Sequence, residues 1–307
     1  MKNGSKKLWG DILFKGFTAF FAAGLVILFV ALVVVLAYQS LPSIKEFGLS
    51  FLVSAKWNPV KEEFGALIPI FGTLVTTFLA LLLAVPLSIG IALFLAELAP
   101  SWLRYPFGTA IELLAAIPSI VYGIWGLFVL SPILADSIEP WLQSKLGFIP
   151  LFSGPMIGIG MLTAGLVLTL MIVPFISSVT RDVFLLVPRP LKEAAYGMGC
   201  TKWEVVRDIM IPYGKKGIAG AVFLGMGRAL GETMAVTFVI GNAHQFSWSL
   251  FAPGNSISST LANEFTEADG VLYLSSLIEL GLVLFLITFI VLGLAQFWLR
   301  YSSGGSR

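Results

Sequence analysis

Long stretches without a charged residue alternate with short polar segments along this 307-residue chain. A helix that crosses a membrane needs about 20 largely apolar residues, and six stretches of the sequence are expected to form such helices. The fifth stretch contains Arg228 and Glu232, and the sixth contains Glu279. The six expected spans lie within residues 17–38, 64–96, 113–135, 146–180, 217–241 and 271–299. The pattern therefore predicts an all-α membrane protein with six transmembrane helices.

Composition supports a membrane environment. Apolar residues make up 57% of the chain and charged residues only 12%, and the mean hydropathy is +0.93. A soluble domain with this composition would have too little polar surface to stay dispersed. Cys200 and His244 are the only residues of their types, which excludes an internal disulfide and makes a metal site unexpected.

Basic residues are concentrated on one side of the predicted topology. If the N-terminus is cytoplasmic, only Lys45, Lys56, Lys61 and Lys145 lie outside. Because cytoplasmic loops carry the excess of Lys and Arg, both termini are predicted to be cytoplasmic. The chain then divides into an N-terminal segment (1–16), a membrane domain (17–300) and a tail (301–307). The fourteen basic residues expected inside are Lys2, Lys6, Lys7, Lys15, Arg104, Arg181, Arg189, Lys192, Lys202, Arg207, Lys215, Lys216, Arg300 and Arg307.

The polar segment between the fourth and fifth spans, at about residues 181–215, carries the local signals of two short helices joined by a turn. Pro190 suits the first turn of one helix, and two glycines precede the capping box of another. Pro212 and Gly214 are expected to close that second helix. The glycines are Gly197 and Gly199, and the capping box pairs Thr201 with Glu204. We expect a rigid helix-turn-helix facing the cytoplasm.

Arg228 and Glu232 form the second group of candidate residues. Arg228 falls near the middle of the fifth span, where a charged side chain costs roughly 2.5 to 3.5 kcal/mol on insertion scales. The four-residue spacing would place Glu232 one turn along on the same helix face, so the pair could neutralise each other and hold helices together. Alternatively, the guanidinium borders a transport pathway and meets an oxyanion. Ser119 and Tyr122, polar residues in the third span, are further pathway candidates, although a helix carbonyl could satisfy either of them.

Catalysis and ATP hydrolysis are not expected of this chain. The sequence has no Walker A phosphate-binding pattern, and the spans lack paired Asp residues or a His with a Ser that could act together. The chain is therefore predicted to be a transport or channel protein and not an enzyme, with no cofactor or metal of its own.

The segment between the fourth and fifth spans resembles the EAA loop of bacterial ABC importer permeases. The family pattern is E-A-A, three residues, G, nine residues, I, one residue and L-P, and only Ile211 departs from it by replacing Leu. The resemblance implies that a separate cytoplasmic ATPase docks on this loop. The residues in register are Glu193, Ala194, Ala195, Gly199, Ile209 and Pro212.

Three further phrases resemble the PstC family of permease subunits from bacterial phosphate importers. They are LLAAIPSIVYGIWGLFVL at 113–130, GRALGETMAV at 227–236 and TFVIGN at 237–242. The resemblance implies the type I ABC importer architecture in the bacterial cytoplasmic membrane, and it ties Arg228 and Glu232 to transport. The implied partners are a homologous PstA-type permease, two ATPase subunits that use ATP and Mg, an extracytoplasmic phosphate-binding protein and the lipid bilayer, with no nucleic acid.

Two alternatives remain open at this point. Sulfate or molybdate importer permeases share the EAA loop and a similar R-A-L-G-E phrase, although Thr233 and Met234 favour phosphate. An ion channel would not need the EAA loop, so copurification of an ATPase would discriminate against it.

Overall fold

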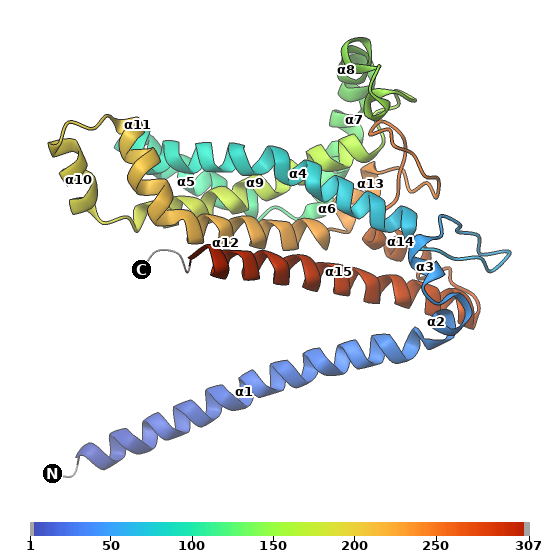
Figure 1. The fold of residues 1–307 in the computed structure, drawn as a ribbon, viewed down its shortest axis with the longest axis horizontal. Helices are drawn as coiled ribbons and strands as arrows, with labels where there is room; N and C mark the ends of the chain where they lie inside the picture. Colours follow the sequence, from blue (N-terminus) through green and yellow to red (C-terminus); the bar gives the residue numbers. More distant parts are fainter. Residues whose placement is uncertain (1–2, 304–307) are drawn as a thin grey trace.

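The computed structural model describes residues 3–303, which fold into helices joined by turns and loops (Figure 1). Apart from one isolated bridge between Asn58 and Glu63, no strand pairing occurs among these residues. Five of the helical segments are long and apolar enough to cross a membrane: Trp9–Gln39, Leu67–Leu98, Ser119–Leu146, Met161–Leu185 and Val271–Phe297. They account for five of the six spans expected from the sequence, and the all-helical membrane fold is confirmed.

The expected fifth span is not one continuous helix. Its chain forms α12 (Ile211–Leu230) and α13 (Met234–Val239), and residues 231–233 between them are not helical. Glycine has low helix propensity, and Gly231 follows the last residue of α12. Non-helical backbone at membrane depth is tolerated where it is buried in protein or lines a cavity. The interruption therefore implies that residues 231–233 do not face lipid.

The third expected span is interrupted in a similar way. The chain leaves α5 (Ser101–Ala115) and starts a new helix, α6 (Ser119–Trp125), directly after Pro118. Pro118 does not kink a continuous helix but precedes the first residue of a new one. The residue before a proline is disfavoured in the α conformation, which explains the break. By contrast, Pro86 and Pro174 lie inside the continuous helices α4 and α9.

The core of the bundle is built on α4 (Leu67–Leu93) and α9 (Met161–Leu185), which pack along each other, with α12 against both. Small residues allow this close packing: a methyl group at Gly165 would lie 2.5 Å from Leu79 Cδ2. Close backbone approach through small residues is the usual basis of helix association in lipid. The buried side chains include Ala80, Ala84, Val167, Met171, Ile172, Ile176, Ala221, Ala229 and Val236.

The end of the bundle opposite the EAA-like segment is made of short helices and loops. The segment 39–63 is partly helical. Its aromatic side chains pack against the last long helix in a separate buried cluster. The elements in this region are α2 (Leu41–Phe47), α3 (Ser50–Val53), α8 (Glu139–Leu146), the short turn η4 (Pro150–Phe152), and α14 (Ile257–Glu264) with the start of α15 (Val271–Ser303). The turns η2 (Gly126–Leu130), α7 (Ser131–Ile133) and η3 (Leu134–Ile138) connect α6 to α8.

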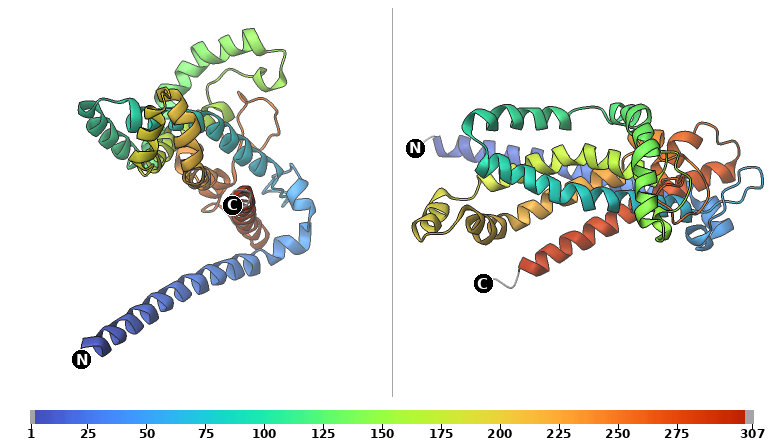
Figure 2. Two further views of the ribbon diagram at one scale, coloured as in Figure 1. Left: turned by 60° about the vertical axis from the view of Figure 1, so that its left-hand side comes forward. Right: turned by 90° about the horizontal axis from the view of Figure 1, so that it is seen from above.

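The first helix, α1 (Asn3–Gln39), slants away from the rest of the bundle (Figures 1 and 2). Its most apolar window has a mean hydropathy of 3.1, and none of that window is buried. A helix that is apolar on all sides needs lipid or another protein around it. The start of α1 and the end of α15 lie at the same end of the molecule as α10 (Arg189–Gly197) (Figure 1). This arrangement agrees with placing both termini and the EAA-like segment on one side of the membrane.

Candidate functional site

Arg228 and Glu232 stand on either side of the interruption in the fifth span. Arg228 lies in the last turn of α12, whereas Glu232 follows the helix and accepts a hydrogen bond from Ala235 N to its Oε1 atom at 3.2 Å. Glu232 therefore caps the start of α13. No salt bridge joins Arg228 to Glu232 among residues 3–303. Of the two alternatives for this pair, the ion pair on one helix face is not formed, because α12 ends at Leu230 and the spacing of one helical turn is lost.

The guanidinium of Arg228 is exposed on the surface of the subunit. Within the described part of the chain, no hydrogen bond or ion pair to its side chain is present. The arginine guanidinium carries five N–H donors and stays positively charged at any physiological pH. Placing this group in lipid without partners is costly. The side chain must therefore face water, a passing ligand or another subunit, and not hydrocarbon.

The two interrupted spans lie side by side and run in the same direction. A methyl group at Gly123 of α6 would lie 2.9 Å from Ala235 Cα of α13, and one at Gly126 would lie 3.1 Å from Val239 Cγ1. The residue numbers of the two contacts rise together on both segments, so the segments are parallel. The first residues of α6 and α13 are therefore at the same end of the pair. The polar start of α6 at Ser119 is thereby brought to the level of the interruption at residues 231–233.

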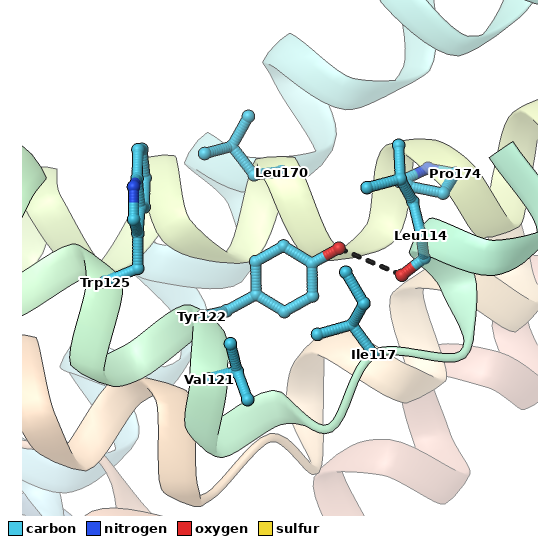
Figure 3. Close-up of a pocket in the computed structure, with 7 residues that line it drawn as sticks. All are labelled: Leu114, Ile117, Val121, Tyr122, Trp125, Leu170 and Pro174. Atoms are coloured by element: carbon cyan, nitrogen blue, oxygen red, sulfur yellow. Dashed lines mark hydrogen bonds between the residues drawn. The ribbon is translucent and has the colours of Figure 1, made fainter. Parts of the chain in front are cut away.

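Tyr122 is the candidate from the third span that the structure brings near Arg228. Tyr122 lies on α6, which packs against α13 directly after the interruption that follows Arg228. The Tyr122 hydroxyl donates a hydrogen bond of 2.9 Å to the Leu114 carbonyl (Figure 3). The expectation that a helix carbonyl could satisfy Tyr122 is thus confirmed, and this bond crosses the break between α5 and α6. Ser119 makes no side-chain hydrogen bond among the described residues.

Tyr122 also borders a cavity of about 420 Å³. Its other walls come from the end of α5, from α6 and from α9, where Leu170 and Pro174 lie opposite the tyrosine (Figure 3). The lining is almost wholly apolar apart from the tyrosine hydroxyl. The cavity therefore provides room beside the interrupted helices but few groups that could hold an ion.

The segment 189–205 forms the expected helix, turn and helix. Its first helix is α10, with Pro190 in the first turn, and Gly199 follows in the turn with a φ of +91°. In α11 (Lys202–Val205), Thr201 and Glu204 make the expected capping box in both directions. The hydrogen bonds from the Thr201 backbone and hydroxyl hold the pKa of Glu204 below its usual range. These local predictions are confirmed.

The end of the second helix was predicted incorrectly. The chain does not leave the helical conformation at Pro212 and Gly214, but continues from α11 through the π-helical turn η5 (Val206–Met210) into α12. Pro212 is in the first turn of α12, where its missing N–H costs little, and Gly214 is packed against Val183. One continuous helical path therefore runs from Lys202 to the interruption beside Arg228.

Residues of the EAA-like pattern divide into packed and exposed groups. Ala195 and Ile209 face a buried cluster with α4, α9 and α12, whereas Glu193, Ala194 and Gly199 are exposed. Large apolar side chains next to the exposed group are uncovered as well: Leu191 is 45%, Met198 79% and Trp203 62% exposed. The segment thus presents an apolar surface at the end of the bundle.

One polar cluster had no clear signal in the sequence. At the opposite end of the bundle, Glu264 accepts hydrogen bonds from Trp57 Nε1 at 2.6 Å, Tyr273 OH at 2.6 Å and His244 Nε2 at 2.7 Å. The His244 ring also stacks on Trp57, with centroids 5.3 Å apart. The cluster ties together the segments after α1, after α13 and at the start of α15.

The described residues contain no group of three or more His, Cys, Asp or Glu side chains that could hold a metal ion. The polar residues at or beside the interruption include Arg228, Glu232 and Thr233, with Ser119 at the start of the neighbouring α6.

Comparison with known proteins agrees with this architecture. Residues 84–301 match the family described as "Binding-protein-dependent transport system inner membrane component". A phosphate transport system permease protein PstC from Pasteurella multocida is 57% identical over 280 residues, covering 90% of this chain and 87% of the relative. The PstC protein of Mesorhizobium japonicum is 56% identical over 293 residues, covering 94% and 90%.

Solved structures of other ABC transporters share the fold. A bacterial transporter that imports the acidic polysaccharide alginate has a chain with a TM-score of 0.63 at 16% identity, covering 97% of this chain and 99% of that one. The inward-facing methionine transporter MetNI gives a TM-score of 0.56 at 16% identity, covering 76% and 94%. This chain belongs to the family of binding-protein-dependent transport system inner membrane components and, within that family, to the PstC permeases.

Proposed function

We propose that this permease carries inorganic phosphate into the cell through a pathway bordered by Arg228, Glu232, Ser119 and Tyr122. The observation that carries the proposal is the unpaired, exposed guanidinium of Arg228 at an interruption within the membrane. A planar fork of N–H donors is suited to the oxygens of a phosphate ion. The names of the similar PstC proteins support the same substrate.

The surroundings of Arg228 favour brief contact over tight capture. An anion that reaches Arg228 also meets the carboxylate of Glu232, which caps α13 nearby and repels negative charge. Attraction by Arg228 and repulsion by Glu232 together let an anion enter the site and leave it again.

We further propose that movement at the EAA-like loop drives this site. The helical path from Lys202 through α12 to Leu230 joins the loop directly to the residues around Arg228. With a rise of 1.5 Å per residue, the 20 residues of α12 alone span about 30 Å. A push on the loop therefore shifts the end of the helix that carries Arg228.

The exposed apolar surface beside Glu193 and Gly199 supports docking of an ATPase at this loop. In the proposed assembly, two ATPase subunits use ATP and Mg on the cytoplasmic side, and a PstA-type permease stands beside this subunit. A phosphate-binding protein delivers the ion from outside the bacterial cytoplasmic membrane. Both termini face the cytoplasm, as the distribution of basic residues favours.

Uptake of labelled phosphate tests the substrate. Cells that lack only this chain should lose high-affinity uptake and regain it with the intact gene. Excess unlabelled phosphate should abolish the signal, whereas sulfate and molybdate at the same concentration should leave it unchanged. Stronger competition by sulfate or molybdate than by phosphate would contradict the proposal and favour the related oxyanion importers.

A further inference from the structure

The EAA-like loop is bound to α4 through one carboxylate. Glu97 lies in η1 (Phe94–Leu98), a π-helical turn that continues α4. Its Oε2 atom pairs with Lys192 Nζ at 2.9 Å, and its Oε1 atom accepts a hydrogen bond from Tyr196 OH at 3.1 Å. Lys192 and Tyr196 are four residues apart on α10, so they project from the same face of that helix. Both oxygens of Glu97 are thus engaged by a single face of α10.

This contact differs from an ordinary surface ion pair. The side chains of Lys192 and Glu97 are only 17% and 15% exposed, and exposed pairs contribute little because solvent screens them. Burial first, and the hydrogen bond to Glu97 second, raise the pKa of Tyr196 above its usual value, so the phenol remains a donor. Two bonds to one carboxylate set the position of α10 along α4 as well as its distance from it.

Apolar packing beneath the ion pair strengthens the connection. Ala195, between the two residues that bind Glu97, is 2% exposed. It belongs to a buried cluster with Ala92 and Ala96, which lie at the end of α4 and in η1. The face of α10 that carries Ala195 is therefore held on α4 by close packing, with the polar bonds at its border.

The connection matters because the chain itself does not link α10 to α4. Glu97 and Lys192 are 95 residues apart in sequence, whereas α10 leads through the turn at Gly199 into α11 and α12. A displacement of α10 reaches α12 through the backbone, but it reaches α4 only across non-covalent contacts. The α4 helix packs along α9 and shares the core cluster that contains Ala229 and Ala235 next to the interruption.

We propose that Glu97 is a positioning residue that transmits movement of α10 to α4. The inference rests on the proposed role of the loop in coupling. In this arrangement the loop moves two helices at once, α12 through the chain and α4 through Glu97. The interruption between α12 and α13 then shifts together with the core that surrounds it. The π-helical form of η1 suits this position, since such turns often occur at functional sites.

The test compares phosphate uptake with ATP hydrolysis in proteoliposomes that contain the complete transporter. In E97Q, the carboxylate charge is lost, and we expect uptake per ATP hydrolysed to fall by about tenfold, within the usual range of coupling between sites. E97K and K192E should each show the same loss, because each places like charges in contact. The double variant E97K/K192E restores an ion pair and should recover most of the ratio.

The matched control is D182N, which neutralises an exposed carboxylate on α9 that pairs with Arg181. It should leave the ratio unchanged, since Arg181 keeps Glu112 as a partner. An unchanged ratio in E97Q, or no recovery in the double variant at equal assembly, would overturn the inference. If G199V loses coupling while E97Q keeps it, the loop still couples and only the role of Glu97 is refuted. If both variants keep coupling, the proposed role of the loop fails as well.

Discussion

Glu264 at one end of the bundle and Arg228 near its middle show two different ways of placing a charge. Glu264 receives three hydrogen bonds from Trp57, His244 and Tyr273. Arg228 is exposed, and the described residues offer it no ion pair or hydrogen bond. A charged group whose partners are all supplied by the protein stabilises one arrangement of the chain. A charged group without partners is free to bind something else, so the site of action is expected at Arg228 and not at Glu264.

Replacing Arg228 should produce the largest effect. R228Q removes the positive charge from the interruption, and we expect phosphate uptake to fall by at least about a hundredfold, as for the loss of a charged contact made to a ligand. R228K keeps the charge but loses the planar fork, so partial activity is expected. Uptake by each variant is measured at matched membrane abundance.

The double variant R228Q/E232Q separates the two interpretations of the pair. A structural ion pair would be relieved by removing both charges, and uptake would then recover. Because Glu232 caps α13 and does not pair with Arg228, we expect no recovery. Near-normal uptake by the double variant would refute the pathway role of Arg228.

The turn at Gly199 should show the next largest effect. Its φ of +91° is open to glycine but disfavoured for a β-branched residue. A methyl group there would meet no atom within 4 Å, so G199V strains the backbone without causing a clash. We expect normal membrane insertion but a loss of ATPase copurification or of coupled uptake. G197A is the matched control, because Gly197 is helical and also has open space around it.

Loss of the Glu264 cluster should reduce stability more than transport. E264Q leaves three donors with a weaker acceptor, and hydrogen bonds to a charged group contribute about 1.5 to 3 kcal/mol each. We expect the melting temperature of the purified complex to fall by several degrees, while uptake at low temperature is largely kept. A large loss of uptake with an unchanged melting temperature would break the contrast between Glu264 and Arg228.

The same cluster predicts how stability depends on pH. Burial opposes ionisation of Glu264, but the hydrogen bonds from His244, Tyr273 and Trp57 outweigh it and hold the pKa below its usual range. A carboxyl whose pKa is lower in the folded state stabilises that state fully above the unfolded pKa, and the contribution is lost as the pH falls through the folded value. The difference in melting temperature between the unmodified protein and E264Q should therefore shrink under acidic conditions.

The cysteine-labelling test of membrane orientation should have the smallest effect on transport, since it requires only substitutions that the protein tolerates. Ser259 lies in the predicted outer loop but is completely buried and bonded to Asn255, so it is a poor site for a cysteine label. Val60 is 93% exposed, and Trp203 in the EAA-like loop is 62% exposed. With Cys200 replaced, an impermeant reagent added outside intact cells should label V60C and not W203C. The reverse pattern would contradict the proposed orientation.

Local features were predictable where neighbouring residues alone decide the outcome. The capping box of Thr201 and Glu204 and the left-handed turn at Gly199 follow from residue type and spacing. The alternative of an ion pair between Arg228 and Glu232 required a continuous helix, but residues 231–233 are not helical. Gly227, Gly231 and the polar pair of Arg228 and Glu232 lie near the middle of the span. These residues were a signal of the interruption that hydrophobic periodicity does not detect.

By itself, the sequence determined the membrane class, the approximate positions of the apolar spans and the helix-turn-helix between the fourth and fifth of them. These depend on hydrophobicity and on contacts within a few residues. The tertiary structure decided where the third and fifth spans break, which ends of α6 and α13 lie together, and which partners Glu264 and Glu97 find. Glu264 meets Trp57 across 207 residues, and Glu97 meets Lys192 across 95. Such partners are chosen by the packing of whole helices, because only packing brings distant segments close enough to form a hydrogen bond.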